Sequence, residues 1–295
     1  MKVTPLPEGE PRPRRVAVGT FDGVHLGHRE VIHGSDTVLT FDPHPVEVLH
    51  PEAAPKLLDS FPIKRDLIAS LGVEELVVIP FDREFASRTH EEFVESVLVA
   101  RLGATHVSVG ENFRFGRRAQ GDVDYLRSRS EFETRVVSLV EVEGETVSSS
   151  QIRALVAAGE VDVAARFLGA PFMLEGEVVA GDRRGRSLGM PTANLVPDDR
   201  LVIPGHGVYA ASVDGRAAAV SVGVRPTFET GRGVLVEAHV IDFEGDLYGE
   251  TVRIAFLERL RGERRFSSSE ALLEQMWADV ERAREACAAA SVPPP

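Results

Sequence analysis

Two histidines stand three residues apart at the end of the stretch GTFDGVHLGH, residues 19–28. A glycine-rich turn between a strand and a helix exposes backbone N–H groups, with the positive end of the helix dipole behind them. A polyphosphate is the natural ligand of such a turn, and His25 and His28 could donate hydrogen bonds to phosphoryl oxygens whose charge rises as a bond breaks. We therefore expect the histidines to be catalytic, and the turn to bind phosphate through Gly19, Phe21, Asp22 and Gly23.

Zinc binding and plain packing are the two alternative roles for this histidine pair. Zinc needs a third and a fourth ligand, and the chain has no HExxH motif and a single cysteine, Cys287. Phosphate chemistry is therefore favoured, and both alternatives stay open.

A second glycine-rich stretch, VVAGDRRGRSLGMPTANL at residues 178–195, combines backbone freedom with positive charge. Its glycines let the backbone approach a nucleotide closely, and its arginines supply charge to phosphates without lysine. These residues are Gly181, Gly185 and Gly189 together with Arg183, Arg184 and Arg186. The alternative is a turn whose arginines face solvent, and GDRRGR alone would favour it.

The PTAN sequence begins two residues after Gly189 and favours nucleotide binding over a turn with solvent-facing arginines. Thr192 offers a hydroxyl and Asn194 an amide oxygen, and such hard oxygen ligands suit Mg²⁺ beside substrate phosphates. We expect both residues to bind the metal, while Gly181, Gly185, Arg186 and Gly189 contact the nucleotide.

The composition is that of a soluble globular protein, with 43% hydrophobic and 27% charged residues. A net charge of −13 argues against a general binder of nucleic acid or of membrane surfaces. Of the 33 basic residues only Lys2, Lys56 and Lys64 are lysines, and no G-K-[ST] motif is present. A phosphate site must therefore use backbone amides, arginines, histidines or a metal.

The sequence carries no signal for secretion or for membrane insertion. Its start, MKVTPLPEGEPRPRR, lacks the apolar segment of a signal peptide, and no run of 18 apolar residues occurs. The single cysteine excludes an internal disulfide, and we expect it to be a packing thiol. We expect a cytoplasmic protein.

Strands and amphipathic helices alternate in the first half of the chain, where they must position the turn that ends in His25 and His28, called the HxGH turn after its residues 25–28. Strands are expected at 14–21, 37–41, 74–80, 105–110 and 134–140, and helices at 61–72 and 89–103. Such alternation indicates an α/β domain with a doubly wound parallel sheet. Ligands of these sheets bind at the carboxyl ends of the strands, which is where the HxGH turn lies.

The second half has a different pattern of apolar and turn residues, which predicts a second domain. Two short helices in the segment 148–172 are followed by closely spaced strands at 175–181, 207–215, 217–224, 234–243 and 251–257. Short strands separated by turn residues indicate an antiparallel barrel or sandwich. A terminal helix begins after SSSE at 267–270 and runs to about Ala290. We expect the domains to cover residues 1–170 and 171–295.

Four ordered stretches resemble the FMN adenylyltransferase half of the bacterial bifunctional riboflavin kinase/FAD synthetase family. They are GTFDGVHLGH (19–28), which is similar to the HxGH signature of nucleotidylyltransferases, TFDPHPVEVL (40–49), VGENFRFGRRAQGD (109–122) and VSSSQIR (147–153). The resemblance implies that ATP binds at the HxGH turn and that flavin contacts Asn112 and Arg114. Ser149 and Ser150, which we expect to cap a helix, and Arg153 would hold the ATP phosphates. A simple capped helix is the alternative interpretation of VSSSQIR.

The second half resembles riboflavin kinases from residue 178 to the C-terminal helix. The matching stretches are VVAGDRRGRSLGMPTANL, GVYAASV (207–213), SVGVRPTF (221–228), VEAHVIDFEGDLYGETV (236–252) and the segment 256–284. The resemblance implies that Glu237, on an inward strand position, is the base that takes the proton from the ribityl 5′-hydroxyl. It also implies that Arg261 and Glu263 belong to a flavin-covering segment. Without the family, Glu237 would be assigned to the outward face of its strand.

The two resemblances together imply a bifunctional transferase of flavin cofactor synthesis. The C-terminal domain would phosphorylate riboflavin with MgATP to give FMN, and the N-terminal domain would adenylylate FMN to give FAD and pyrophosphate. His25, His28 and Arg153 would stabilise the charge of the second transfer without a covalent intermediate. The alternatives are a riboflavin kinase whose N-terminal domain is inactive or uses another acceptor, and a flavin-binding regulator without turnover.

The connection after the HxGH turn is unusually short. Only eleven residues, REVIHGSDTVL, separate His28 from TFDPHP, whereas a crossover between parallel strands, with its helix, needs roughly a dozen residues or more. Either the helix after the turn is clipped to one or two turns, or residues are absent from this sequence.

Overall fold

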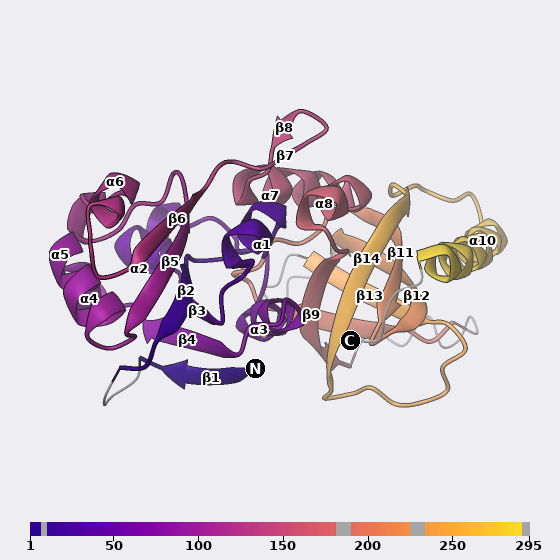
Figure 1. Ribbon diagram of the computed structural model, residues 1–295. Helices are drawn as coiled ribbons and strands as arrows, with labels where there is room; N and C mark the ends of the chain where they lie inside the picture. Colours follow the sequence, from indigo (N-terminus) through magenta and orange to yellow (C-terminus); the bar gives the residue numbers. More distant parts are fainter. Residues whose placement is uncertain (7–10, 181–189, 225–233, 291–295) are drawn as a thin grey trace. The chain divides into compact units, whose positions relative to one another are not determined.

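The computed structural model describes residues 1–6, 11–180, 190–224 and 234–290 (Figure 1). Its contacts divide the chain into two compact units, Met1–Lys56 with Phe61–Ser149 and Leu57–Ser60 with Ser150–Pro295. The residues between 150 and 170 thus group with the second unit by their contacts. The domain boundary expected at 170 and 171 stays a prediction.

A six-stranded parallel sheet forms the centre of the first unit, in the order β1-β4-β3-β2-β5-β6. Its strands are β1 (Lys2–Pro5), β2 (Arg14–Val18), β3 (Thr37–Asp42), β4 (Glu75–Pro80), β5 (Ala104–Gly110) and β6 (Glu133–Val137). Five of the six correspond to expected strands, so the predicted doubly wound sheet is confirmed. The additional strand, β1, is a mostly exposed edge strand that pairs with β4.

The helices of the first unit are mostly short. They are α1 (Leu26–Ile32), α2 (Pro45–Leu49), α3 (Phe61–Ser70), α4 (Arg83–Ala86), α5 (His90–Glu92) and α6 (Val123–Arg127), with a π-helical continuation of α5 named η2 (Phe93–Val99). Two 3-10 turns, η1 (Pro51–Ala53) and η3 (Arg117–Ala119), and the hairpin of β7 (Glu141–Val142) and β8 (Glu145–Thr146) complete the unit. The helix expected at 89–103 is therefore α5 followed by η2.

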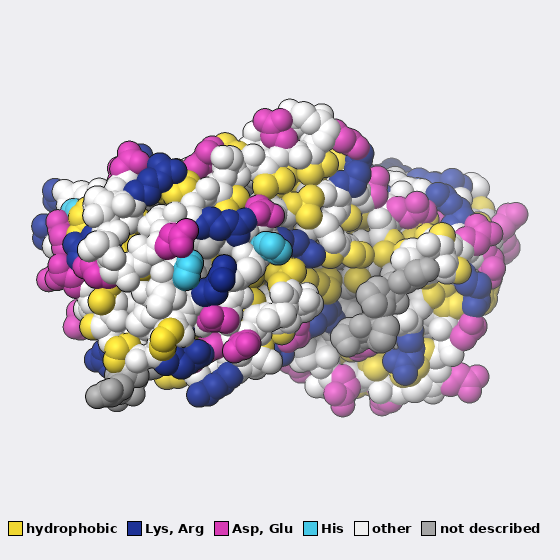
Figure 2. Space-filling model, viewed as in Figure 1, with side chains coloured by type: hydrophobic (Ala, Val, Ile, Leu, Met, Phe, Trp, Pro, Cys, Tyr) yellow, Lys and Arg dark blue, Asp and Glu magenta, His cyan; other side chains and the backbone are white. Residues whose placement is uncertain are grey.

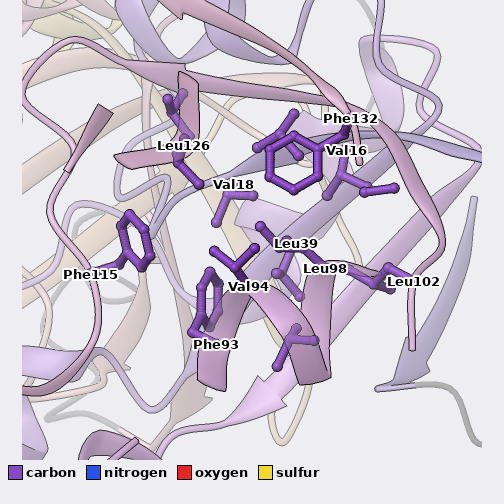
Figure 3. Packing of buried hydrophobic residues seen from close by; sticks show 14 of the residues in the cluster. Val16, Val18, Leu39, Phe93, Val94, Leu98, Leu102, Phe115, Leu126 and Phe132 are labelled. Atoms are coloured by element: carbon purple, nitrogen blue, oxygen red, sulfur yellow. The ribbon is translucent and has the colours of Figure 1, made fainter. Parts of the chain in front are cut away.

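Both faces of this sheet are buried, as a doubly wound fold requires. Val16 and Val18 point to a cluster with η2 and α6, whereas Ala17 between them points to a cluster with α1 and α3. Figure 3 shows Phe93, Val94 and other residues of the first cluster packed against the strands. Because successive side chains of a strand point to opposite faces, β2 contributes residues to the hydrophobic cores on both sides of the sheet.

A closed antiparallel barrel forms the second unit, in the order β10-β13-β12-β11-β14-β9. The strands are β9 (Phe172–Val179), β10 (Ala193–Pro197), β11 (Gly207–Val213), β12 (Arg216–Val224), β13 (Val234–Val240) and β14 (Thr251–Arg261). The choice between barrel and sandwich is thereby settled in favour of the barrel. Strand β10, which closes the barrel against β9, was not among the expected strands.

The faces of the barrel strands follow from register and burial. Paired residues from neighbouring strands are at most 1% exposed and line the interior, among them Tyr209, Val220, Val222, Val236 and Ala238. The residues between them face outward, where α10 (Ser269–Ala290) packs on Ala210 and Leu260. The predicted helical pair is α7 (Ser149–Ala158) and α8 (Val161–Leu168).

Cys287 lies in α10 as a half-buried thiol whose Sγ is 3.1 Å from the carbonyl oxygen of Ala211. Burial raises the pKa of the Cys287 thiol, which fits the expected packing role. Within the described ranges, no helix has both the length and the apolar character that crossing a membrane requires.

Candidate functional site

The strand order of the first unit reverses at β2. The chain proceeds from β2 to β3 and β4 on one side, and β5 and β6 lie on the other side. Ligands of such sheets bind at the carboxyl ends of the strands where the order reverses. The HxGH turn follows β2 and Asn112 follows β5. The turn expected to bind ATP and the residue expected to contact flavin therefore come after the two neighbouring strands at which the order reverses.

The turn after β2 has an unusual backbone. Phe21, Gly23 and Val24 have φ angles of 51°, 87° and 39°, and such angles cost a phenylalanine or a β-branched residue of the order of 1–3 kcal/mol each. Burial holds them in place, because Phe21 is 1% exposed and Val24 is 0% exposed. A Cβ on Gly19 would lie 3.0 Å from Cζ of Phe21, so glycine makes room for that ring. Strain of this kind concentrates at functional sites.

The imidazoles of His25 and His28 stack on each other. Their ring centroids are 3.6 Å apart and the planes differ by 16°. His25 is the N-cap of α1, and its Nδ1 accepts a hydrogen bond from the backbone N–H of His28 at 3.2 Å. Neutral His25 therefore carries its proton on Nε2, where it can donate to a ligand. The backbone N–H of His28 donates to this capping side chain. It is therefore not one of the backbone amides that could bind phosphate.

His28 is held in its neutral form by its surroundings. Burial lowers the pKa of His28 well below its usual value, and electrostatic interactions with His25 and Lys64 lower this pKa further. Within the part of the chain that the structure describes, the buried Nδ1 of His28 has no hydrogen-bond partner. A neutral imidazole is a hydrogen-bond donor through one nitrogen and an acceptor through the other.

Lys64 was not expected at this site. It lies on α3 and is only 7% exposed, although lysine is rarely buried. The sequence contains a signal for this position, because Lys64 is three residues after Phe61 and three before Leu67 and so shares their helix face.

Helix α1 has seven residues, so the short connection noted in the sequence is a clipped helix of about two turns. The alternative of a longer helix with absent residues is not needed to join β2 to β3. A short helix has a weaker backbone dipole, so a phosphate bound at this turn would depend mainly on contacts from the turn itself.

The start of the VSSSQIR helix meets the HxGH turn. Ser149 Oγ donates a hydrogen bond to the carbonyl oxygen of Asp22 at 3.0 Å, and Asp22 is 2% exposed. Because α7 begins at Ser149, Ser149 and Ser150 are its first two residues and do not precede it as caps. Arg153 belongs to the second unit, and its Nη1 lies 3.4 Å from Ser150 Oγ.

The two expected flavin contacts lie on the loop after β5 and are exposed. Asn112 is the second residue after β5, and its Oδ1 would be 3.5 Å from a Cβ on Gly110. Arg114 Nη1 forms a 2.8 Å ion pair with Asp122, the N-cap residue of α6. Arg114 is thus oriented by the loop that carries it.

Asn194 and Glu237, both expected at the candidate site of the second unit, lie together in the structure. They are register partners on β10 and β13, and Glu237 is also the partner of Ser221 on β12. Glu237 is half-buried on the outer face of the barrel, which contradicts the inward position expected for it, because Val236 and Ala238 beside it occupy the interior. Asn194, on the same outer face, is 4% exposed, and its Oδ1 has no hydrogen-bond partner among the described residues.

His239 supports this site and was not expected. It lies two residues after Glu237 and on the same face of β13, and its Nδ1 is 2.8 Å from the carbonyl oxygen of Pro191. A carbonyl only accepts, so Nδ1 donates and ties β13 to the residue before Thr192. The alternation in VEAHV contained this signal, because a period of two puts both polar residues on one face.

Arg261 is the last residue of β14, Glu263 follows it by two residues, and both contact neighbouring elements. Arg261 donates through Nε to Asp279 at 2.9 Å, and Gln275 donates to the other oxygen of Asp279 at 2.9 Å. Asp279 is 2% exposed, so α10 contributes a buried carboxylate besides its packing face. Glu263 lies against Gly223, where a Cβ would be 2.7 Å from Glu263 Oε1.

Several expected site residues fall outside the described ranges, namely Gly181, Gly185, Arg186 and Gly189. Within those ranges, no group of three or more His, Cys, Asp or Glu side chains is placed to hold a metal ion. A magnesium ion at PTAN would depend on the neutral oxygens of Thr192 and Asn194 and on substrate phosphates. Figure 2 shows histidine side chains on the face of the first unit, with basic and acidic side chains around them.

Two family models match the chain, one in each half. The model described as FAD synthetase matches residues 8–151, and the model described as riboflavin kinase matches residues 168–287. A bifunctional riboflavin kinase/FMN adenylyltransferase from Pseudomonas fluorescens is 37% identical over 284 residues, covering 90% of this chain and 91% of the relative. The protein of the same name from Escherichia coli (strain K12) is 34% identical over 288 residues, covering 92% and 91%.

A solved structure shows the same architecture over both units. A crystal structure described as a macrolide-efflux protein from Streptococcus pneumoniae has a TM-score of 0.84 and 32% identity, covering 96% of this chain and 99% of that one. Its name refers to macrolide efflux, an activity that neither matching family model mentions.

Proposed function

The chain belongs to the family of bifunctional riboflavin kinase/FMN adenylyltransferases, and from that premise we propose how its residues carry out two transfers from ATP. The enzyme is a transferase that phosphorylates riboflavin to FMN and adenylylates FMN to FAD. A kinase with an inactive N-terminal half is not favoured, because the FAD synthetase model matches residues 8–151. We assign adenylyl transfer to residues 1–170 and the kinase to residues 171–295.

Adenylyl transfer takes place at the HxGH turn. A phosphate oxygen of FMN attacks the α-phosphorus of ATP, the bond from this phosphorus to the bridging oxygen breaks, and pyrophosphate leaves. His25 and His28 donate hydrogen bonds to phosphoryl oxygens as their charge rises. The observation that supports this role is the stacked pair itself, with His25 Nδ1 engaged by a backbone N–H so that Nε2 carries the proton.

The ATP phosphates are held by the turn and by the start of α7. The contact of Ser149 with the carbonyl oxygen of Asp22 supports this placement, because it joins the two segments. Arg153 is four residues after Ser149 on the same helix, and residues four apart share a helix face. From the sequence we assign ATP binding to Gly19, Phe21, Asp22, Gly23, Ser149 and Ser150, and a phosphate contact to Arg153.

FMN is held on the neighbouring strand by Asn112 and Arg114. Asn112 extends from the end of β5, next to β2, so it can reach the same edge of the sheet as the HxGH turn. The ion pair with Asp122 fixes the guanidinium of Arg114 near this loop.

Riboflavin phosphorylation takes place at the pair of Asn194 and Glu237. Glu237 takes the proton of the ribityl 5′-hydroxyl, the freed oxygen attacks the γ-phosphorus, and ADP leaves. The carboxylate is only half-buried on the outer face, so substrate can approach it without entering the closed barrel.

Magnesium is the cation that this site fits. The buried Oδ1 of Asn194, which has no hydrogen-bond partner among the described residues, is an oxygen donor prepared for a ligand. We assign the metal to Thr192 and Asn194, with ATP phosphates as further ligands. When bound there, the ion neutralises charge on the transferring phosphoryl group.

Two further groups of residues complete the kinase site. Arg261 and Glu263 contact the flavin from the segment that Asp279 anchors. Gly181, Gly185, Arg186 and Gly189 contact ATP, an assignment that rests on the sequence. We also place the enzyme in the cytoplasm, where ATP is available for both transfers.

A timed assay tests the two activities. Purified enzyme is incubated with riboflavin and MgATP, and FMN, FAD and pyrophosphate are resolved by chromatography. We expect FMN to appear first and FAD and pyrophosphate to follow. FMN that accumulates without FAD, even when FMN is supplied together with pyrophosphatase, would show that the first unit is inactive. Binding of riboflavin without any FMN would show a flavin-binding regulator.

A further inference from the structure

The two turns of α1 carry both histidines of the adenylyl-transfer site. His25 is the N-cap of this helix and His28 is its third residue. A helix of seven residues is marginal on its own, because few hydrogen bonds compensate the cost of starting it. The position of the imidazoles therefore depends on what holds α1 to the sheet.

Ser108 forms a hydrogen bond with one of the last carbonyl groups of α1. The hydroxyl of Ser108, on β5, donates a hydrogen bond of 2.7 Å to the carbonyl oxygen of Val31. Ser108 is 6% exposed and Val31 is also 6% exposed, so the bond is buried. The last four carbonyls of a helix have no partner within the helix, and a buried carbonyl without a partner is costly.

Arg135 forms a hydrogen bond with the carbonyl group of the residue that follows α1. Its Nη1, on β6, donates a hydrogen bond of 2.7 Å to the carbonyl oxygen of His33, the C-cap residue. Its guanidinium also forms an ion pair with Glu30 of α1. A positive charge at the C-terminal end of a helix is favourable, because the exposed carbonyls carry partial negative charge.

We propose that Ser108 and Arg135 are positioning residues for adenylyl transfer, which fix the C-terminal end of α1 to β5 and β6 and thereby set the imidazoles. The proposal rests on the proposed catalytic role of His25 and His28. Ser108 is on the strand that ends before Asn112, so one strand aligns the catalytic helix and the proposed flavin contact. A displacement of about 1 Å at a reacting group can cost up to about 100-fold in rate.

The test measures FAD formation from FMN and MgATP in Ser108→Ala and in Ser108→Thr. We expect kcat to fall at least about tenfold in the alanine variant, with the KM for FMN and for ATP within about twofold. Threonine restores the hydroxyl and should recover most of kcat. Ser70→Ala is the matched control, because Ser70 Oγ also donates to a helix carbonyl, that of Leu67, at 2.7 Å on α3. It should leave kcat unchanged.

Riboflavin phosphorylation in the same preparations must stay at the wild-type rate, and circular dichroism must show a folded chain. An alanine variant with normal kcat, or a loss of kcat that threonine does not recover, overturns the proposal. If Ser108→Ala does not fold, the test uses the exposed Arg135 instead. Arg135→Ala should lower kcat, and Arg135→Lys should recover part of it. An unchanged kcat in Arg135→Ala overturns the proposal. Absence of FAD formation in the wild-type enzyme would instead refute the proposed function.

Discussion

Asn194 and Glu237 are register partners on β10 and β13, and both lie on the outer face of a closed barrel. Side chains of directly paired residues are neighbours on one face of an antiparallel sheet. A buried amide oxygen and a half-buried carboxylate thereby lie next to each other on that face. The interior of the barrel is filled with apolar side chains and serves as a rigid support.

Glu237→Gln should abolish riboflavin phosphorylation and spare FAD formation from supplied FMN. General-base catalysis contributes about 10²–10⁴-fold, so we expect kcat for FMN formation to fall by at least about 100-fold. Glu258→Gln is the control, because Glu258 is an exposed strand carboxylate on β14. Loss of both activities in Glu237→Gln would contradict two separate sites.

Asn194→Leu should make the second unit more stable and the kinase inactive. The substitution removes a buried amide oxygen without a hydrogen-bond partner among the described residues, and we expect the free energy of unfolding to rise by roughly 1 kcal/mol. Trp277, the only tryptophan, lies on α10 and reports unfolding of this unit in urea by fluorescence. A variant that is less stable, or that phosphorylates riboflavin normally, would disagree with a metal ligand at this position.

His28 should make the first unit less stable in mild acid. Its pKa is lowered in the folded state, first by burial, whereas an unfolded histidine has a pKa of about 6.5. The unfolded chain therefore binds the proton more readily, and the free energy of unfolding falls as pH drops below about 6.5 until the folded-state pKa is reached. His28→Gln should remove this part of the pH dependence, measured by hydrogen exchange of β2 amides at pH 7.5 and 5.5.

The same variant should lose about 100-fold in FAD formation, because it removes a transition-state donor. His106→Gln is the control, since His106 is exposed and its Nε2 pairs with Glu133 at 3.3 Å. An unchanged pH dependence in His28→Gln would exclude the proposed neutral, buried imidazole.

Glu75 should stabilise the first unit at neutral pH. It is 5% exposed and accepts hydrogen bonds from Arg14 at 3.0 Å and from Thr4 of β1 at 3.0 Å. Burial alone would raise the pKa of Glu75, but the hydrogen bonds from Arg14 and Thr4 outweigh it and lower the pKa. Its contribution is therefore complete well above the unfolded pKa of about 4.3 and is lost as pH falls through the folded-state pKa.

Glu75→Gln should lower the free energy of unfolding of the first unit by roughly 3 kcal/mol at pH 7. The difference from the wild type should shrink at pH 4, measured by hydrogen exchange of β4 amides. Glu74→Gln, which changes the exposed neighbouring carboxylate, should have little effect. A difference that stays constant with pH would contradict the ionised, paired state of Glu75.

The strands that sequence analysis predicted are those with apolar periodicity. β2 to β6 and five of the six barrel strands have it, whereas β1 is an exposed edge strand and β10 begins within PTAN, whose polar residues suggested only a ligand site. The outward position of Glu237 follows from a period of two, yet its proposed catalytic role suggested the interior. Interactions between distant residues, such as the hydrogen bond of Ser108 with the carbonyl oxygen of Val31 and the effect of Lys64 on the pKa of His28, have no local pattern and required the structure.

The burial of Lys64 makes the enzyme suitable for selective chemical labelling. Amine-reactive dyes modify exposed lysines and the terminal amine, and here only Lys2 and Lys56 are exposed among three lysines. Lys64 is 7% exposed, so the folded protein should take up label at Lys2, Lys56 and the N-terminus. A fluorophore or an immobilisation tether can thus be attached while the amine of Lys64, which acts electrostatically on His28, stays unmodified.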